Sequence, residues 1–140
     1  MLVTEIGRGT IGLPELQRPF VWPNAKIREL FDSLHRGYPC GFLLLWETGA
    51  GLKGIGTNSK DETPSLAIVD GQQRLTSLYA VMTGAEVIRA DFSRERIRIA
   101  FDSLAERFAV ANAAKAQDRA FISDVAAFCQ YNRCSDERWR

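Results

Sequence analysis

The residues best suited to chemistry stand in one run, Asp70-Gly71-Gln72-Gln73-Arg74, between two apolar segments. Each glutamine amide offers donors and an acceptor, and Arg74 supplies a permanently charged fork that suits phosphate. Gly71 has no side chain, so a phosphate can approach the backbone closely. Asp70 is a candidate Mg²⁺ ligand, or a clamp for a ribose hydroxyl or for Arg74. The run therefore predicts a site for the phosphates of a nucleotide or nucleic acid.

Two elements are expected to position this run. Residues 66–69 form a short apolar segment typical of a strand, and residues 72–83 have a helical period that ends at Gly84. The apolar face of this helix is formed by Leu75, Leu78, Tyr79 and Met82. The run then occupies a helix N-terminus, where unpaired backbone N–H groups and the helix dipole favour anions.

Packing offers an alternative explanation of the same residues. Asp70 can cap the helix, and Arg74 can pair with Asp70 or with Glu47. A second candidate is Gln17-Arg18, held in the proline-punctuated segment 14–23. These two residues provide either a second phosphate contact or, for Arg18, a surface arginine stacked on a neighbouring aromatic ring.

The rest of the scaffold is predicted from periodicity. Asn24 is expected to cap a helix whose apolar face ends at Leu34, with Gly37 after its C-terminus and Trp22 anchored beneath it. The continuous apolar run within 41–47 predicts a central strand buried on both faces. His35 is expected at the surface.

The segments outside these elements give weaker signals. Residues 1–13 suggest a hairpin or strand broken by glycines, and the glycine-rich residues 48–65 suggest a mobile loop that closes over the site. Residues 97–101 are expected to pair with 107–111. A helix is expected over 121–131, with Phe121, Val125 and Phe128 facing inward. The arginines at 89–98 suggest a solvated strand face.

Composition excludes several classes of protein. The chain has 140 residues, 46% hydrophobic and 25% charged, which fits one α/β domain over 1–140. Its net charge of +1 gives no global attraction to DNA or membranes, so an anion site must be local. No run is long enough to span a bilayer and no signal peptide precedes the domain, so we expect the cytoplasm. Three irregularly spaced cysteines argue against a disulfide framework.

Three blocks of the sequence together are similar to a known family. They are residues 13–22 (LPELQRPFVW), residues 34–46 with Gly37-Tyr38-Pro39, and residues 69–76 (VDGQQRLT). Their order and spacing resemble the N-terminal domain of GmrSD-type, type IV restriction endonucleases. The resemblance covers residues 10–84, and the sequence ends without a helix stop signal, as in the N-terminal part of a longer protein.

The resemblance implies a ParB/sulfiredoxin-like fold, a small mixed sheet flanked by helices. It implies an NTP-binding module that controls restriction of modified DNA or phage defence, with a nuclease domain or subunit as partner. Related defence proteins use the Asp-Gly-Gln-Gln-Arg motif for NTP hydrolysis. By that analogy Asp70, Gln72, Gln73 and Arg74 are catalytic, with Mg²⁺ at Asp70. Gly71 and Gln17-Arg18 join Gln72, Gln73 and Arg74 in binding phosphate.

The sequence also departs from the family pattern. Leu16 stands where an aromatic residue usually precedes Gln-Arg, and a single histidine cannot supply a His-Asn-His nuclease centre. No cysteine lies within 70–74, which argues against sulfinic acid reduction. The alternative function is a non-catalytic ParB-like domain that binds DNA or a partner. The resemblance thus predicts NTP binding, with or without NTP hydrolysis.

Overall fold

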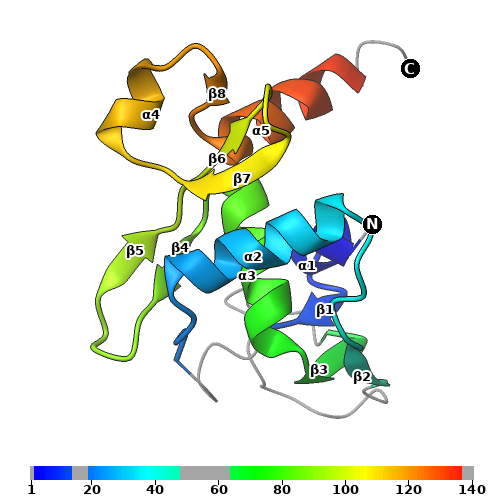
Figure 1. The fold of residues 1–140 in the computed structure, drawn as a ribbon. Helices are drawn as coiled ribbons and strands as arrows, with labels where there is room; N and C mark the ends of the chain where they lie inside the picture. Colours follow the sequence, from blue (N-terminus) through cyan, green and yellow to red (C-terminus); the bar gives the residue numbers. More distant parts are fainter. Residues whose placement is uncertain (1, 14–18, 48–63, 137–140) are drawn as a thin grey trace.

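The computed structural model describes residues 2–13, 19–47 and 64–136, with side chains up to residue 130. Its helices are α1 Leu2–Gly7, α2 Asn24–His35, α3 Gln72–Thr83, α4 Ala113–Gln117 and α5 Val125–Asp136. Its strands are β1 Ile11–Gly12, β2 Leu44–Glu47, β3 Leu66–Asp70, β4 Glu86–Ile88, β5 Arg94–Arg96, β6 Ile99–Asp102, β7 Arg107–Val110 and β8 Phe121–Ile122. The predicted mixed α/β class with small sheets is confirmed (Figure 1).

The sheet that carries the Asp-Gly-Gln-Gln-Arg run has the strand order β1-β3-β2. Strand β3 is central: it pairs in parallel with β1 and antiparallel with β2, so the sheet is mixed. The prediction of a central strand at 41–47 is therefore wrong, because β2 lies at the edge among the described strands.

Burial of both faces was also predicted for 41–47, and this too is wrong. Leu43 and Leu45 pack against the small core of Ile11, Ile68 and Leu75. The alternate side chains face away from it, with Phe42 92%, Leu44 57% and Trp46 64% exposed. The apolar run is continuous because one face of the strand is buried while the other presents large apolar side chains to solvent.

The larger core lies between α2, α3 and the strands that follow α3. Its buried members are Phe20, Ile27, Phe31, Ala80, Val81, Val87, Ile97 and Ile99. Trp22 packs against this cluster, as predicted, and α3 extends from the first sheet toward the β7-β6-β8 sheet (Figure 1). Burial of these side chains removes apolar surface from water and holds α3 against the elements that pack on it.

Helix α2 ends as predicted, but it begins at Asn24 itself, so Asn24 is not its cap. Pro23 is the N-cap residue and no side chain caps the helix. The Asn24 amide instead donates to Glu95 Oε1 at 3.0 Å and accepts from Arg89 Nη2 at 2.7 Å. At the other end Gly37, with φ 71°, donates its N–H to Leu34 O, as a C′ glycine does. The Leu34 side chain is 44% exposed, so the buried face ends one turn earlier than predicted.

The N-terminal segment is the helix α1 followed by the two-residue strand β1, so the hairpin or strand predicted over 1–13 is confirmed as a strand only at Ile11–Gly12. Val3 is buried and Ile6, three residues later, packs on the Ile11 core, which is a helical spacing. The glycines misled the prediction because Gly7 is tolerated at the end of α1. Only Gly9 requires a left-handed conformation, with φ 78°.

The last third combines a confirmed hairpin with a shifted helix. Strands β6 and β7 pair antiparallel, with Ile99 opposite Val110, as predicted. Phe121 belongs to β8 instead of the last helix and is half-buried, whereas Phe128 is 50% exposed, so Phe128 was wrongly placed inward. His35 is exposed at the surface, as predicted.

Residues 48–63 of the predicted loop lie outside the described residues. Within the described part of the chain, no helix could cross a membrane.

Candidate functional site

The Asp-Gly-Gln-Gln-Arg run occupies the turn between the central strand and α3. Strand β3 ends at Asp70, Gly71 is the N-cap of α3, and the helix begins at Gln72. Gly71 has φ 91°, and a Cβ placed there would collide with Leu43 Cδ2. The left-handed conformation therefore favours glycine, a larger residue would also displace the Leu43 side chain, and the helix starts directly after the strand.

A hollow of about 310 Å³ lies at this turn. Its lining residues are Trp22, Ile68, Val69, Asp70, Gly71, Gln72, Gln73 and Arg74. No side chain caps α3, and no acidic residue lies in its first turn. The positive end of the helix dipole is thus not offset by a carboxylate of its own first turn. Asp70 does not cap α3, so this alternative prediction is wrong.

Arg74 reaches back over the turn to the chain before β2. Its Nη1 donates to Cys40 O at 2.6 Å and its Nη2 donates to Phe42 O at 2.7 Å. Nη2 also lies 3.5 Å from Asp70 Oδ2, so of the two predicted pairings it is the one with Asp70 that forms. The guanidinium is 19% exposed and holds residues 40–42 beside α3. Its charge stays next to the hollow.

Gln73 binds the backbone of the segment before α2. Its Oε1 accepts from Val21 N–H at 3.1 Å, and its Nε2 donates to Pro19 O at 3.2 Å. The amide therefore pairs with this segment much as a neighbouring strand would. Gln17 and Arg18, the predicted second wall, lie outside the described residues. Gln73 fixes the chain directly after them.

Asp70 differs from its neighbours in being open to solvent. Its carboxylate side chain is 76% exposed at the rim of the hollow. Among the described residues no group of three or more metal-ligating side chains gathers around it or elsewhere. One carboxylate with an anionic ligand beside it is nevertheless a common Mg²⁺ arrangement, because the ligand's phosphates and water complete the shell.

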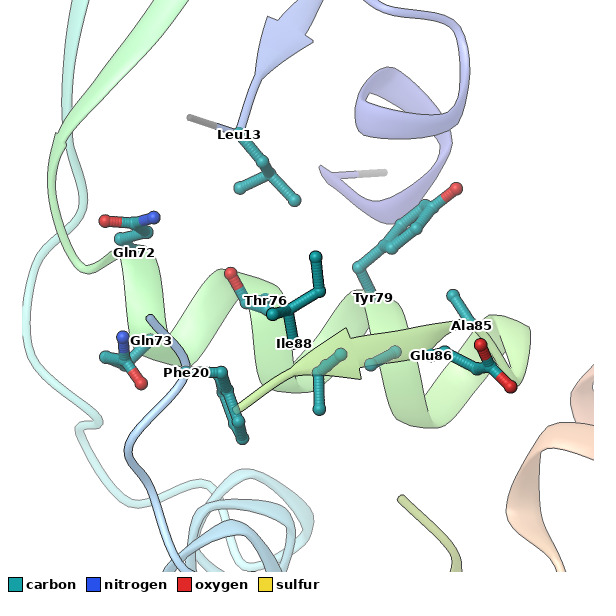
Figure 2. Close-up of a pocket in the computed structure, with 11 residues that line it drawn as sticks. Leu13, Phe20, Gln72, Gln73, Thr76, Tyr79, Ala85, Glu86 and Ile88 are labelled. Carbon is teal, nitrogen blue, oxygen red and sulfur yellow. The ribbon is translucent and has the colours of Figure 1, made fainter. Parts of the chain in front are cut away.

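A second cavity, of about 330 Å³, runs along the side of α3. Gln72 and Gln73 line it as well as the first hollow, so the two spaces adjoin at the start of the helix. Its other lining residues are Leu13, Phe20, Thr76, Tyr79, Ala80, Ala85, Glu86, Val87 and Ile88 (Figure 2). Sequence reasoning missed this cavity, because its walls come from three separate segments of the chain.

Arg89 was also missed as a positioning residue. Its Nε pairs with Glu95 Oε2 at 2.6 Å, its Nη1 donates to Trp22 O, and its guanidinium lies 5.0 Å from the Phe20 ring. The side chain is 17% exposed, so the solvated face predicted for residues 89–98 is wrong at this position. Hydrogen bonds from Arg89 and then from Asn24 hold the pKa of Glu95 below its usual value. The network fixes Phe20, a wall of the second cavity.

Comparisons with known proteins identify the family. Residues 1–137 match the family described as GmrSD restriction endonuclease, N-terminal domain, and the chain belongs to this family. The predicted resemblance is thereby confirmed. The chain is also 34% identical over 89 residues to an uncharacterized protein of Methanocaldococcus jannaschii. That match covers 56% of this chain and 15% of the relative, so the chain spans a small part of that protein's length.

Proposed function

We propose, from its membership of the GmrSD N-terminal domain family, that this chain is the NTP-binding control module of a restriction or phage-defence system. It would act in the cytoplasm beside a nuclease domain or subunit that cuts DNA, and the ParB/sulfiredoxin-like fold is part of the same proposal. The family supports the restriction context, and the chemistry of the α3 N-terminus supports the nucleotide.

One observation carries the nucleotide assignment: an uncapped helix start opens on a hollow of about 310 Å³, with Arg74 beside it. First-turn N–H groups of a helix have no intrahelical acceptor and favour anions. Gly71 leaves the backbone unshielded, and the Arg74 guanidinium raises the local positive potential. Phosphate groups match this combination of donors and charge.

The geometry divides the roles among the motif residues. Arg74 and Gln73 already bind backbone groups, so we assign them to positioning and, for Arg74, to electrostatic stabilisation of phosphate. Asp70 is the residue that would hold Mg²⁺, which neutralises phosphate charge when bound. If NTP is hydrolysed, Gln72 or Gln73 is our candidate for orienting the attacking water, because both amides lie in the first turn of α3 and line the hollow.

The test adds one negative charge to the site. Gln72→Glu places an anion in the first turn of α3, where the dipole favours it, and its melting temperature checks that the fold is kept. It should lose at least about tenfold in affinity for Mg²⁺–NTP, because the carboxylate repels phosphate. Gln117→Glu, at an exposed position of α4, makes the same charge change away from the site. Unchanged affinity in Gln72→Glu would remove the α3 N-terminus from the proposal.

A second candidate is a partner-binding module without nucleotide, and one surface favours it. Phe42, Leu44 and Trp46 project from the edge strand β2 and the chain before it, and Val69 on β3 is 59% exposed. Large exposed apolar surfaces commonly mark interaction sites. Calorimetry separates the candidates: folded protein that binds neither nucleotide nor inorganic triphosphate supports the partner-binding function.

A further inference from the structure

The second cavity contains polar groups that the described part of the chain does not use. The hydroxyls of Thr76 and Tyr79 and the carboxylate of Glu86 have no hydrogen-bond or ion-pair partner among the described residues. By contrast the neighbouring side chains of Gln73 and Arg74 are engaged. A mainly apolar pocket with a few open polar groups is the usual form of a small-molecule site.

The polar groups of this cavity follow one another along its length, beside α3. Gln72, Thr76 and Tyr79 lie at a helical spacing of four and three residues, so they share one face of α3. Figure 2 shows Glu86 at the opposite end of the cavity from Gln72, beyond Tyr79. At 1.5 Å per residue, Thr76 lies about 6 Å and Tyr79 about 10 Å along the helix from Gln72.

We propose that this cavity binds the nucleoside of the nucleotide whose phosphates lie at the α3 N-terminus, and that Glu86 selects guanine. The inference rests on the proposed function and deepens it. Phosphates occupy the first hollow, the sugar passes Gln72 and meets the Thr76 hydroxyl, and the base enters the apolar end. The separation of about 10 Å along α3 suits the distance from the inner phosphates of a nucleotide to its base.

The choice of guanine follows from the chemistry of a carboxylate. An ionised carboxylate only accepts hydrogen bonds, and it can accept two parallel ones. Among the four bases, guanine alone offers two adjacent N–H donors on its Watson–Crick edge. Adenine and cytosine set a ring-nitrogen acceptor beside their amino group, and uracil flanks its N–H with two carbonyls. Those acceptors would face the Glu86 carboxylate and be repelled.

The apolar walls suit the faces of a purine ring. Leu13 comes from the end of β1, Ile88 from β4, and the Tyr79 ring from α3 (Figure 2). A flat base between such side chains gains dispersion and stacking contacts. Arg89 supports this wall because it holds Phe20, which also lines the cavity.

The experiment is a calorimetric panel on the full chain with Mg²⁺ and GTP, ATP, CTP, UTP or inorganic triphosphate. Wild-type protein should bind GTP at least about tenfold more tightly than the other nucleotides. Glu86→Gln keeps the size of the side chain but replaces one acceptor with a donor, and it should weaken GTP about tenfold or more. Its affinity for inorganic triphosphate should be unchanged. Thr76→Val, which removes the hydroxyl assigned to the sugar, should weaken every nucleotide alike.

The control is Glu106→Gln, which makes the same change in the turn between β6 and β7, away from the cavity. It should leave every affinity unchanged. Triphosphate binding with equal affinity for all four nucleotides, or a Glu86→Gln variant that keeps its preference for GTP, would overturn the base site alone. If the protein binds neither inorganic triphosphate nor any of the nucleotides, the phosphate site and the base site are overturned together.

Discussion

Replacing Arg74 should destabilise the fold even when no ligand is present, because the side chain joins two distant segments. Arg74→Met keeps the apolar stem and removes both donors, those to Cys40 O at 2.6 Å and to Phe42 O at 2.7 Å. A hydrogen bond from a charged donor contributes about 1.5–3 kcal/mol. Phe42 is exposed and Cys40 is half-buried, so water can replace part of this loss. We therefore expect the free energy of unfolding to fall by about 2 kcal/mol in total.

The neighbouring ion pair provides the comparison. Asp70 is 76% exposed and its Oδ2 lies 3.5 Å from Arg74 Nη2, so screening by water leaves little stabilisation. Asp70→Asn should change the free energy of unfolding by less than about 0.5 kcal/mol. Both values can be measured by urea unfolding followed by fluorescence of the three tryptophans. An Arg74→Met variant as stable as the wild type would refute the positioning role and leave Arg74 as a ligand group only.

Three further predictions concern the frame of the site. Gly71→Ala should cost more than about 2 kcal/mol in urea unfolding, since the new Cβ meets Leu43 in a left-handed conformation, whereas Gly7→Ala, with no atom within 4 Å of its Cβ, should be near neutral. Arg89→Met should cost about 2–4 kcal/mol and weaken nucleotide binding, because it leaves Glu95 without its charged partner. The depressed pKa of Glu95 contributes stability above its usual value of 4.5 that is lost as the pH falls through the lower folded value. Urea midpoints from pH 7 to pH 3 should therefore fall less steeply in Glu95→Gln than in the wild type.

The helices around the site were predictable because their information is local. In α3, Leu75 and the apolar positions that follow it repeat with the helical period, and Gly84 ends the helix with φ 75°. In α2, Ile27 and Phe31 do the same. The helical period is set by which side chains are buried, so the sequence of the helix itself is enough to reveal it.

The edge strand β2 was mispredicted because burial depends on partners. Leu44 and Trp46 are exposed because nothing packs on that face of the sheet within the described residues. An apolar run gives the same sequence signal whether one face or both faces are covered. Only the elements that pack on each face of the sheet distinguish the two cases.

The position of the motif at a strand-to-helix turn was predicted correctly from the sequence, but the contacts of its side chains depend on the fold. Gln73 binds a segment 52 to 54 residues earlier in the chain, and Arg74 binds one 32 to 34 residues earlier. No local pattern reveals such partners. The same limit hid Arg89 and Glu86, whose surroundings depend on β4 lying beside α3 and Phe20.

The most direct measurement of the central claim is a titration of the ¹⁵N-labelled chain with inorganic triphosphate and Mg²⁺, followed by amide chemical shifts. Binding at the α3 N-terminus should move the amide resonances of Gly71, Gln72, Gln73 and Arg74 most strongly, while those of β6 and β7 stay in place. Saturable shifts confined to another part of the chain, or no shifts at millimolar triphosphate, would contradict the account.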